Sequence, residues 1–173
     1  MTSGDLPPPF RLADASGDWH AYLDEVFERF HADLVRSQAC FQGLRVLTPR
    51  HPEDQGKHAS FWHVTSEGDR GEHERTPDMR RCERIAWIRW TIENAGRDPR
   101  VSWWENERRT RRGPQTHVVL LVESERFVVV LARRSNADGE RYLVLRTAYC
   151  VDRDHRLRRL IDERDAWRRR HGC

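Results

Sequence analysis

The spacing of the hydrophobic residues changes near the middle of the chain. Over residues 18–37 and 76–95, apolar side chains recur at steps of three and four, the spacing of a helix with one buried face. After residue 100 the apolar residues fall into short runs rich in valine, leucine and aromatic side chains, which favours β-strands. Residues 153–171 return to helical spacing. Helices thus come before a run of strands, and a helix follows them, which is the order of an α+β domain and not of alternating βαβ units.

Polar and proline-rich stretches separate the elements of the first half. Residues 1–16 predict a loose, flexible tail ahead of a single α+β domain at 17–173. Residues 41–47 fit either a short strand or the end of a helix. The two prolines of 48–56 predict a loop, and the aromatic and β-branched residues of 61–66 predict a strand.

The second predicted helix has clear end signals. Thr76 is a suitable N-cap, Pro77 a suitable first helical residue, and Gly96 a terminator. The strands that follow are joined by short polar loops, so neighbouring strands must run antiparallel. They are predicted at 101–104, 117–123, 127–133 and 142–151.

Composition narrows the class of protein. A chain of 173 residues fits one domain with one core. Its apolar content is 37% and its charged content 34%, so the core must be compact, and seven tryptophans add to its buried area. No run of about 18 apolar residues and no signal peptide is visible. We therefore expect a cytoplasmic protein that does not associate with membranes.

Arginine dominates the basic residues. Of the 31 lysines and arginines, Lys57 is the one lysine, and the net charge is +3. Guanidinium groups bind phosphates in a bidentate way and stack on bases, which suits RNA or DNA. A genome rich in G and C would give the same bias without any such function.

Lys57 lies in the segment with the densest candidate chemistry. His58 and His63 follow it within seven residues of sequence. A histidine has a pKa near neutral pH and can accept or donate a proton during attack on a phosphodiester. The segment is therefore either a site for proton transfer or phosphate binding, or a polar loop that leads into a strand.

Two further groups of residues suggest a phosphate site. Arg80, Arg81 and Arg84 follow the start of the second helix, where they either clamp a phosphate or form a solvated face paired with nearby acids. In the last strand, regular alternation places Thr147 and Tyr149 on the same face as the aliphatic residues Leu143 and Leu145. Such a change from apolar to polar along one face places a site beside the core.

Several kinds of site lack their usual motifs. The four cysteines are far apart and form no CxxC pair, and no pair of histidines has the spacing of a common metal motif. No P-loop, GxGxxG or GxSxG motif is present. We therefore expect no metal and no cofactor.

Four segments together resemble a known group of proteins. They are residues 61–68 (FWHVTSEG), 75–85 (RTPDMRRCERI), 104–107 (WENE) and 147–149 (TAY). In this combination the chain, over residues 57–167, resembles small phage- and mobile-element-associated proteins of the barnase–EndoU–colicin–RelE class of ribonuclease-like folds.

This resemblance implies both a fold and an activity. The fold has N-terminal helices packed on a mainly antiparallel four-stranded sheet, with a C-terminal helix. The activity is metal-independent cleavage of RNA through attack by the 2′-hydroxyl, often by a toxin with an antitoxin as protein partner. The resemblance implies catalytic roles for His63, Arg84, Thr147 and Tyr149, with Lys57 and Arg80 in support. In such a reaction we expect His63 to be the base, Arg84 or Lys57 the cation beside the phosphate, and Tyr149 a proton donor. The candidate substrate-binding residues are Lys57, His58, Arg80 and Arg81.

Two other interpretations remain open at this stage. The same fold can serve as a non-catalytic module that binds RNA or a protein, and a prophage can encode a purely structural domain. An enzyme requires His63, Arg84, Thr147 and Tyr149 around one cleft, whereas a structural domain would leave them on separate faces.

Overall fold

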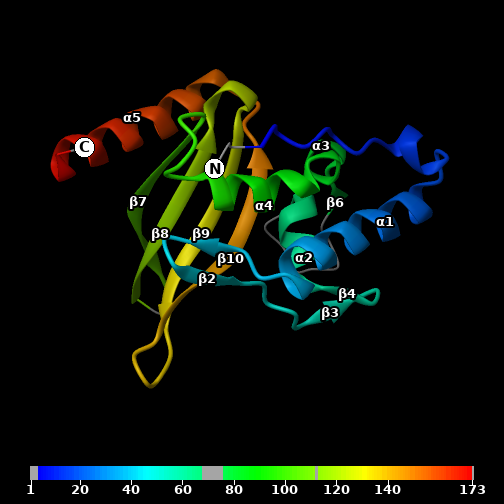
Figure 1. Ribbon diagram of the computed structural model, residues 1–173, viewed down its shortest axis with the longest axis horizontal. Coiled ribbons are helices and arrows are strands. Elements are labelled where there is room, and N and C mark those ends of the chain that lie inside the picture. The colour runs from blue at the N-terminus through cyan, green and yellow to red at the C-terminus, as the bar shows by residue number, and fades with distance from the viewer. Residues whose placement is uncertain (1–3, 68–75, 112, 173) are drawn as a thin grey trace.

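The strands of the second half form the centre of the molecule (Figure 1). A computed structural model describes residues 4–67, 76–111 and 113–172. Four long strands form an antiparallel meander, each longer than or close to its predicted range. They are β7 (Val101–Thr110), β8 (Gly113–Val122), β9 (Phe127–Ser135) and β10 (Arg141–Cys150).

The sheet is larger than the predicted four strands and is mixed. β2 (Leu44–Leu47) lies parallel to β10, and β1 (Cys40–Phe41) pairs antiparallel with β2. The strand order is β1-β2-β10-β9-β8-β7. The short apolar run that fitted either a strand or a helix end is thus a hairpin that extends the sheet beyond β10.

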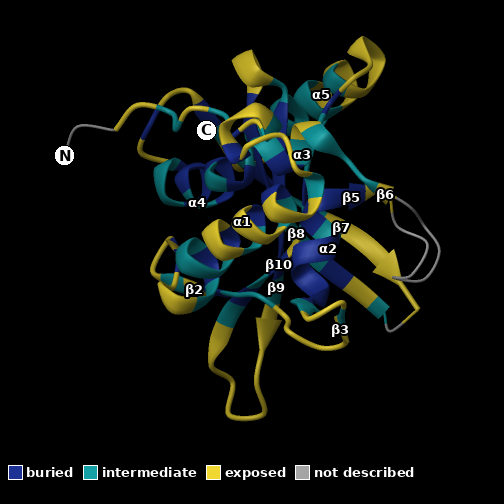
Figure 2. Cartoon of the chain, turned by 90° about the vertical axis from the view of Figure 1, so that its right-hand side faces the viewer, coloured by how far each residue is buried: buried dark blue, intermediate teal, exposed yellow. Residues whose placement is uncertain are grey.

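The N-terminal helices cover one face of the sheet and bury the main core. α1 (Trp19–His31) continues into a π-helical turn at Ala32–Arg36, as the helical spacing predicted. With α2 (Ala59–Thr65), α3 (Met79–Glu83) and α4 (Ile85–Asn94), it packs on the apolar face of the meander. Figure 2 shows buried segments on α2, α4 and the strands that they face. The core residues of the sheet include Val118, Leu120, Val129, Leu131, Leu143 and Leu145.

The opposite face of the sheet is covered at one end only. α5 (Asp154–His171) crosses that end of the strands (Figure 1). Its side chains Leu157, Leu160 and Trp167 form a second, smaller core with residues of the meander. Those residues are Trp104, Val119, Leu121 and Val128. The C-terminal helix is therefore confirmed, and it leaves the other end of this face uncovered.

The segment predicted to be a loose tail packs against the helices from Gly4 onwards. Phe10 is buried, and its N–H donates to the carbonyl of Glu83 at 2.8 Å. The indole N–H groups of Trp87 and Trp90 donate to the carbonyls of Pro7 and Gly4. A 3₁₀ turn follows at Leu12–Ala15. Proline-rich composition suggested a tail, but these carbonyls satisfy the polar ends of two large buried side chains.

The predicted strand at 61–66 is a helix, α2. Every residue of α2 except His63 is buried, and the Thr65 hydroxyl donates to the carbonyl one turn earlier, that of Phe61. Aromatic and β-branched residues prefer strands only weakly, and packing on several sides overrides that preference. A short hairpin precedes α2, with β3 (Glu53–Asp54) paired to β4 (Lys57–His58).

The second predicted helix starts later than expected and is interrupted. Its N-cap is Asp78, whose carboxylate accepts from the N–H of Arg80 at 2.9 Å. The expected cap, Thr76, instead lies in β6 (Thr76–Pro77), which pairs with β5 (Ser66–Glu67). Arg84 separates α3 from α4, and Gly96 follows the helix with a positive φ of 77°.

A β-bulge in β10 decides which side chains face the open end of the sheet. The pairing with β9 shifts register between Leu145 and Thr147, so Arg146 is the extra residue. An extra residue reverses the alternation of side chains beyond it. Leu143 and Leu145 therefore face the main core, whereas Thr147 and Tyr149 face the opposite side. The prediction that all four share one face is wrong for this reason.

Substitution of Tyr22 tests how the N-terminal segment is held. Tyr22 is fully buried, and its hydroxyl donates to the carbonyl of Phe10 at 2.8 Å. Tyr22→Phe leaves that carbonyl without its donor, so the free energy of unfolding should fall by about 1–2 kcal/mol. Urea unfolding measures the loss. Tyr142→Phe is the control, because the Tyr142 hydroxyl has no hydrogen bond within the described residues; equal effects of the two substitutions would contradict the assignment.

Candidate functional site

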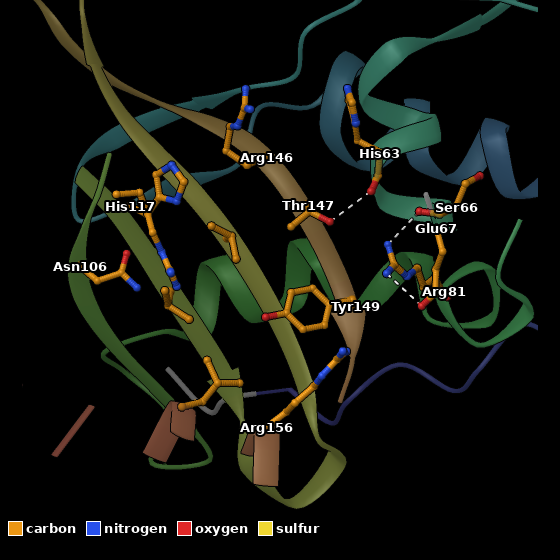
Figure 3. Close-up of a pocket in the computed structure, with 14 residues that line it drawn as sticks. His63, Ser66, Glu67, Arg81, Asn106, His117, Arg146, Thr147, Tyr149 and Arg156 are labelled. Carbon is orange, nitrogen blue, oxygen red and sulfur yellow. Dashed lines mark hydrogen bonds and ion pairs between the residues drawn. The ribbon is translucent and has the colours of Figure 1, made fainter. Parts of the chain in front are cut away.

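The uncovered end of the α5 face forms a cleft of about 700 Å³ (Figure 3). Its floor is the sheet, where neighbouring strands place polar residues in rows. Asn106 of β7 lies opposite His117 of β8, and Thr147 of β10 lies opposite Val130 of β9. The walls come from α2, α3 and the start of α5. The cleft therefore gathers side chains from both halves of the chain.

Four of the predicted site residues line this cleft: His63, Arg81, Thr147 and Tyr149. The Thr147 hydroxyl donates to the main-chain carbonyl of His63 at 3.1 Å. In Figure 3 the imidazole of His63 is directed away from Tyr149. The guanidinium of Arg81 donates to the Ser66 carbonyl at 2.9 Å and lies 5.8 Å from the centre of the Tyr149 ring.

The other two arginines of the predicted cluster do not line the cleft. Arg80 pairs with Asp152 in a two-point contact and so ties α3 to the segment between β10 and α5. Arg84 lies 4.9 Å from the ring centre of Trp87, and its guanidinium donates to the carbonyl of Arg80. Both arginines therefore have structural partners, and the catalytic role predicted for Arg84 has no support in this geometry.

Lys57 and His58 also lie outside the cleft. The Lys57 ammonium donates to Asp24 on α1 at 2.6 Å, and this hydrogen bond lowers the pKa of the Asp24 carboxyl. His58 is buried with its ring against Phe27 and His31, at 5.3 and 5.6 Å between ring centres. Burial lowers the pKa of His58. Both side chains therefore hold the hairpin β3–β4 to α1.

The cleft also contains residues that the sequence analysis did not single out. Arg108, Arg146 and Arg156 line it, from β7, the bulge of β10 and α5. Within the described residues, none of these three arginines forms an ion pair with a carboxylate. The predicted strands were too short to include residues 106 and 108. The alternation of polar residues along 104–108 and 115–119 is the signal that would have found this face.

His117 lies among cations at the floor of the cleft. Burial lowers the pKa of its imidazole, and Arg146, Arg108 and Arg134 lower it further. These causes act together because both low polarity and neighbouring positive charge disfavour the imidazolium form. His117 is therefore neutral at neutral pH.

The Tyr149 hydroxyl stays protonated at neutral pH. Burial raises its pKa, and Arg108 and Arg81 oppose this increase. The hydroxyl has no hydrogen-bond partner among the described residues. It is therefore a donor available to a ligand in the cleft.

Asn106 offers a ligand an acceptor. Its amide N–H donates to Glu163 of α5 at 2.6 Å, which fixes the orientation of the side chain. The amide oxygen is buried and has no partner within the described residues. A buried acceptor without a partner costs free energy that a hydroxyl or amino group of a ligand would recover.

The described part of the chain shows neither a metal cluster nor a membrane helix. Its His, Cys, Asp and Glu side chains nowhere gather in groups of three or more with metal-binding geometry. None of its helices combines the length and the apolar character that a membrane span needs. Cys40, Cys82 and Cys150 form no disulfide. No family model, curated protein or solved structure matches the chain.

The structural role of His58 predicts a dependence of stability on pH. The pKa of His58 is lower in the folded protein than in the unfolded chain, so the unfolded chain binds more protons once the pH falls below about 6.5. Stability contributed by neutral His58 is present above that pH and is lost as the pH falls toward the folded pKa. Urea midpoints should therefore fall from pH 7.5 to pH 5.5.

A pair of substitutions separates His58 from the other histidines. His58→Gln should reduce the dependence of the urea midpoint on pH, because it removes the buried titrating group. His20→Gln, at an exposed position of α1, should leave it unchanged. If the His58 variant shows the same pH dependence as the wild type, its burial is not the cause.

Proposed function

We propose that the cleft binds the phosphodiester backbone of RNA and cleaves it through attack by the 2′-hydroxyl. The observation that carries this proposal is the set of three arginines, Arg108, Arg146 and Arg156, that line one cleft and have no carboxylate partner in the part of the chain that the structure describes. Cations that line one cleft without forming ion pairs suit an anionic ligand. The neutral His117 and the Tyr149 hydroxyl add uncharged groups beside them.

The arginines supply the electrostatic part of the proposed reaction. Guanidinium groups beside the non-bridging oxygens stabilise the additional negative charge of the pentavalent phosphorane. Arg108 and Arg146 take the role of the cation beside the phosphate that was expected of Arg84 or Lys57. The Tyr149 hydroxyl is the proposed donor to a phosphate oxygen.

The reaction moves two protons. The 2′-oxygen forms a bond to phosphorus and the bond from phosphorus to the 5′-oxygen breaks, which gives a 2′,3′-cyclic phosphate and a 5′-hydroxyl. One proton leaves the 2′-hydroxyl and one reaches the 5′-oxygen. His63 remains the proposed base, and its ring must turn toward Thr147 to act. Tyr149, on the floor of the cleft, is the proposed proton donor to the 5′-oxygen. The neutral His117 can donate a hydrogen bond to a phosphate oxygen but does not release a proton.

A specific observation favours a second function, which is binding without cleavage. The imidazole of His63 is directed away from Tyr149, so the base is not in place (Figure 3). The arginines alone suffice to hold RNA. A protein partner such as an antitoxin, a role as a toxin and a cytoplasmic location stay predictions.

Cleavage is tested with purified protein and a single-stranded RNA in the presence of EDTA. We expect fragments that end in a 2′,3′-cyclic phosphate, detected by mass spectrometry. A DNA of the same sequence should bind and remain intact, because it lacks the attacking 2′-hydroxyl. His63→Ala should abolish cleavage and keep the fold.

The outcomes separate the two functions. Binding of both RNA and DNA without any product would support the non-catalytic module. Equal cleavage by wild type and His63→Ala would remove His63 from the reaction. Inhibition by EDTA would show that the reaction depends on a metal ion.

The role of Arg146 is tested by binding. Arg146→Gln should weaken affinity for an uncleavable 2′-O-methyl RNA by about 10- to 150-fold, because a charge-assisted hydrogen bond contributes about 1.5–3 kcal/mol. The slope of log K against log salt should fall by about 0.7 for the one lost phosphate contact.

Arg141→Gln is the matched control for Arg146→Gln. Arg141 carries the same charge on the same strand, is exposed and does not line the cleft. Its substitution should leave affinity and slope near the wild-type values. Equal losses for the two variants would mean that overall charge, and not the cleft, determines binding.

A further inference from the structure

Gln115 connects His117 to an arginine of the next strand. Gln115 lies on β8 two residues before His117, so both side chains project from the same face of the sheet. It is only 7% exposed. On one side its amide lies 3.2 Å from Nε2 of His117, and on the other side it contacts the guanidinium of Arg134 on β9. A buried amide in this position must satisfy both neighbours.

The chemistry of the neighbours decides which way the amide points. A guanidinium has only donors, so the oxygen of Gln115 must face Arg134, whose Nε lies 3.2 Å away. The opposite orientation would place the NH₂ group against other N–H groups. The NH₂ group therefore faces Nε2 of His117 and donates to it. An imidazole nitrogen that accepts a hydrogen bond carries no proton.

We propose that Gln115 is a positioning residue that fixes His117 as a neutral imidazole with its proton on Nδ1. The ring then offers an N–H donor to a ligand in the cleft. Nδ1 makes no hydrogen bond within the described residues, so it is the nitrogen left for that ligand. The tautomer stands on this geometry alone, whereas its role in catalysis rests on the function proposed above.

Within the described residues, the charged groups that shift the pKa of His117 oppose its protonation. They are Arg108 of β7, Arg134 of β9 and Arg146 of β10. An imidazolium would also need a hydrogen-bond acceptor at Nε2. Gln115 could supply its oxygen there only by turning its NH₂ group toward the N–H groups of Arg134. The chain of hydrogen bonds from Arg134 through Gln115 to His117 therefore favours the neutral imidazole. The surrounding cations favour the same state.

This assignment separates the roles of the two histidines in the cleft. With its Nε2 lone pair engaged by Gln115, His117 is not available to take the proton of the 2′-hydroxyl. Its Nδ1–H can instead donate to a phosphate oxygen. The proton acceptor must then come from elsewhere, as His63 does in the proposed reaction.

The test is nitrogen NMR of the full chain labelled at histidine, at pH 7.5. The signals of His117 are assigned by their loss in His117→Ala. In the wild type we expect an unprotonated Nε2 and a protonated Nδ1. A proton on Nε2, or an imidazolium, would overturn the proposal.

Two substitutions of Gln115 test whether this residue sets the tautomer of His117. Gln115→Glu presents only acceptors, so the proton should move to Nε2 and the pKa of His117 should rise. Gln115→Met keeps the length of the side chain and removes the amide, so the Nδ1–H tautomer should no longer dominate. Gln38→Glu makes the same charge change at an exposed position outside the cleft and should leave the His117 signals unchanged. An unaltered tautomer in both Gln115 variants would show that Gln115 does not set it.

RNA cleavage provides the second measurement. Gln115→Glu should lower the rate by about 100-fold, the usual cost of one lost donor to the transition state. If His117 carries its proton on Nδ1 but the protein cleaves no RNA, the role of Gln115 stands and the proposed cleavage is contradicted. If the protein cleaves RNA but His117 carries its proton on Nε2, the proposed cleavage stands and the role of Gln115 is contradicted.

Discussion

The central meander has to bury both of its faces, and this requirement shapes the rest of the molecule. The helices of the first half pack on one face and bury the main core there, whereas α5 packs on one end of the other face. The apolar side chains of α5 can shield only as many strand residues as they reach, which are Trp104, Val119, Leu121 and Val128. Beyond them, the strands carry polar side chains, beginning with Asn106 and His117. Burying these side chains under a longer helix would cost free energy without adding apolar contacts. The cleft therefore lies where apolar burial ends.

The bulge at Arg146 changes which side chains of β10 point to each face of the sheet. Up to Leu145 the strand contributes apolar side chains to the main core. Beyond the bulge, Thr147 and Tyr149 turn to the cleft, while Ala148 takes their place in the core. A regular strand would have buried the Tyr149 hydroxyl under the helices and turned Ala148 to the cleft. One extra residue thus supplies a core residue and two cleft residues from the same segment.

The sequence predicted the elements whose pattern is long and regular. α1, α5 and the four meander strands were found because burial on one side imposes a repeat of 3.6 or 2 residues. The hairpin at β1 and β2 and the helix α2 were missed or left open, because short segments packed on several sides show no repeat. Pairing of β2 with β10 joins residues about a hundred positions apart, and no local pattern records it.

The candidate site was predicted in part for the same physical reason. Thr147 and Tyr149 were singled out, but the face they share with Leu145 was wrong, because alternation cannot reveal a bulge. Lys57, the one lysine, was predicted to belong to the site. Its ammonium instead lies 2.6 Å from Asp24 and joins the β3–β4 hairpin to α1. Arg108 and Arg146 were indistinguishable in sequence from the other arginines. What sets them apart is their place in the cleft, where they have no carboxylate partner among the described residues, and that place is a property of the fold.

The electrostatics of the cleft explain why its floor carries a neutral histidine. Arg108, Arg134 and Arg146 repel one another, and a further positive charge at His117 would add to this cost. Keeping His117 neutral limits the repulsion while retaining a hydrogen-bond donor beside the cations. A bound phosphate would relieve the repulsion. These arginines, which have no carboxylate partner among the described residues, would therefore favour the binding of an anion. Oδ1 of Asn106 and the Tyr149 hydroxyl have no hydrogen-bond partner within the described residues, and a ligand that bonded to them would recover the free energy that this costs. The free energy of the cleft is therefore highest when no ligand is bound, and this is the physical argument for a binding site there.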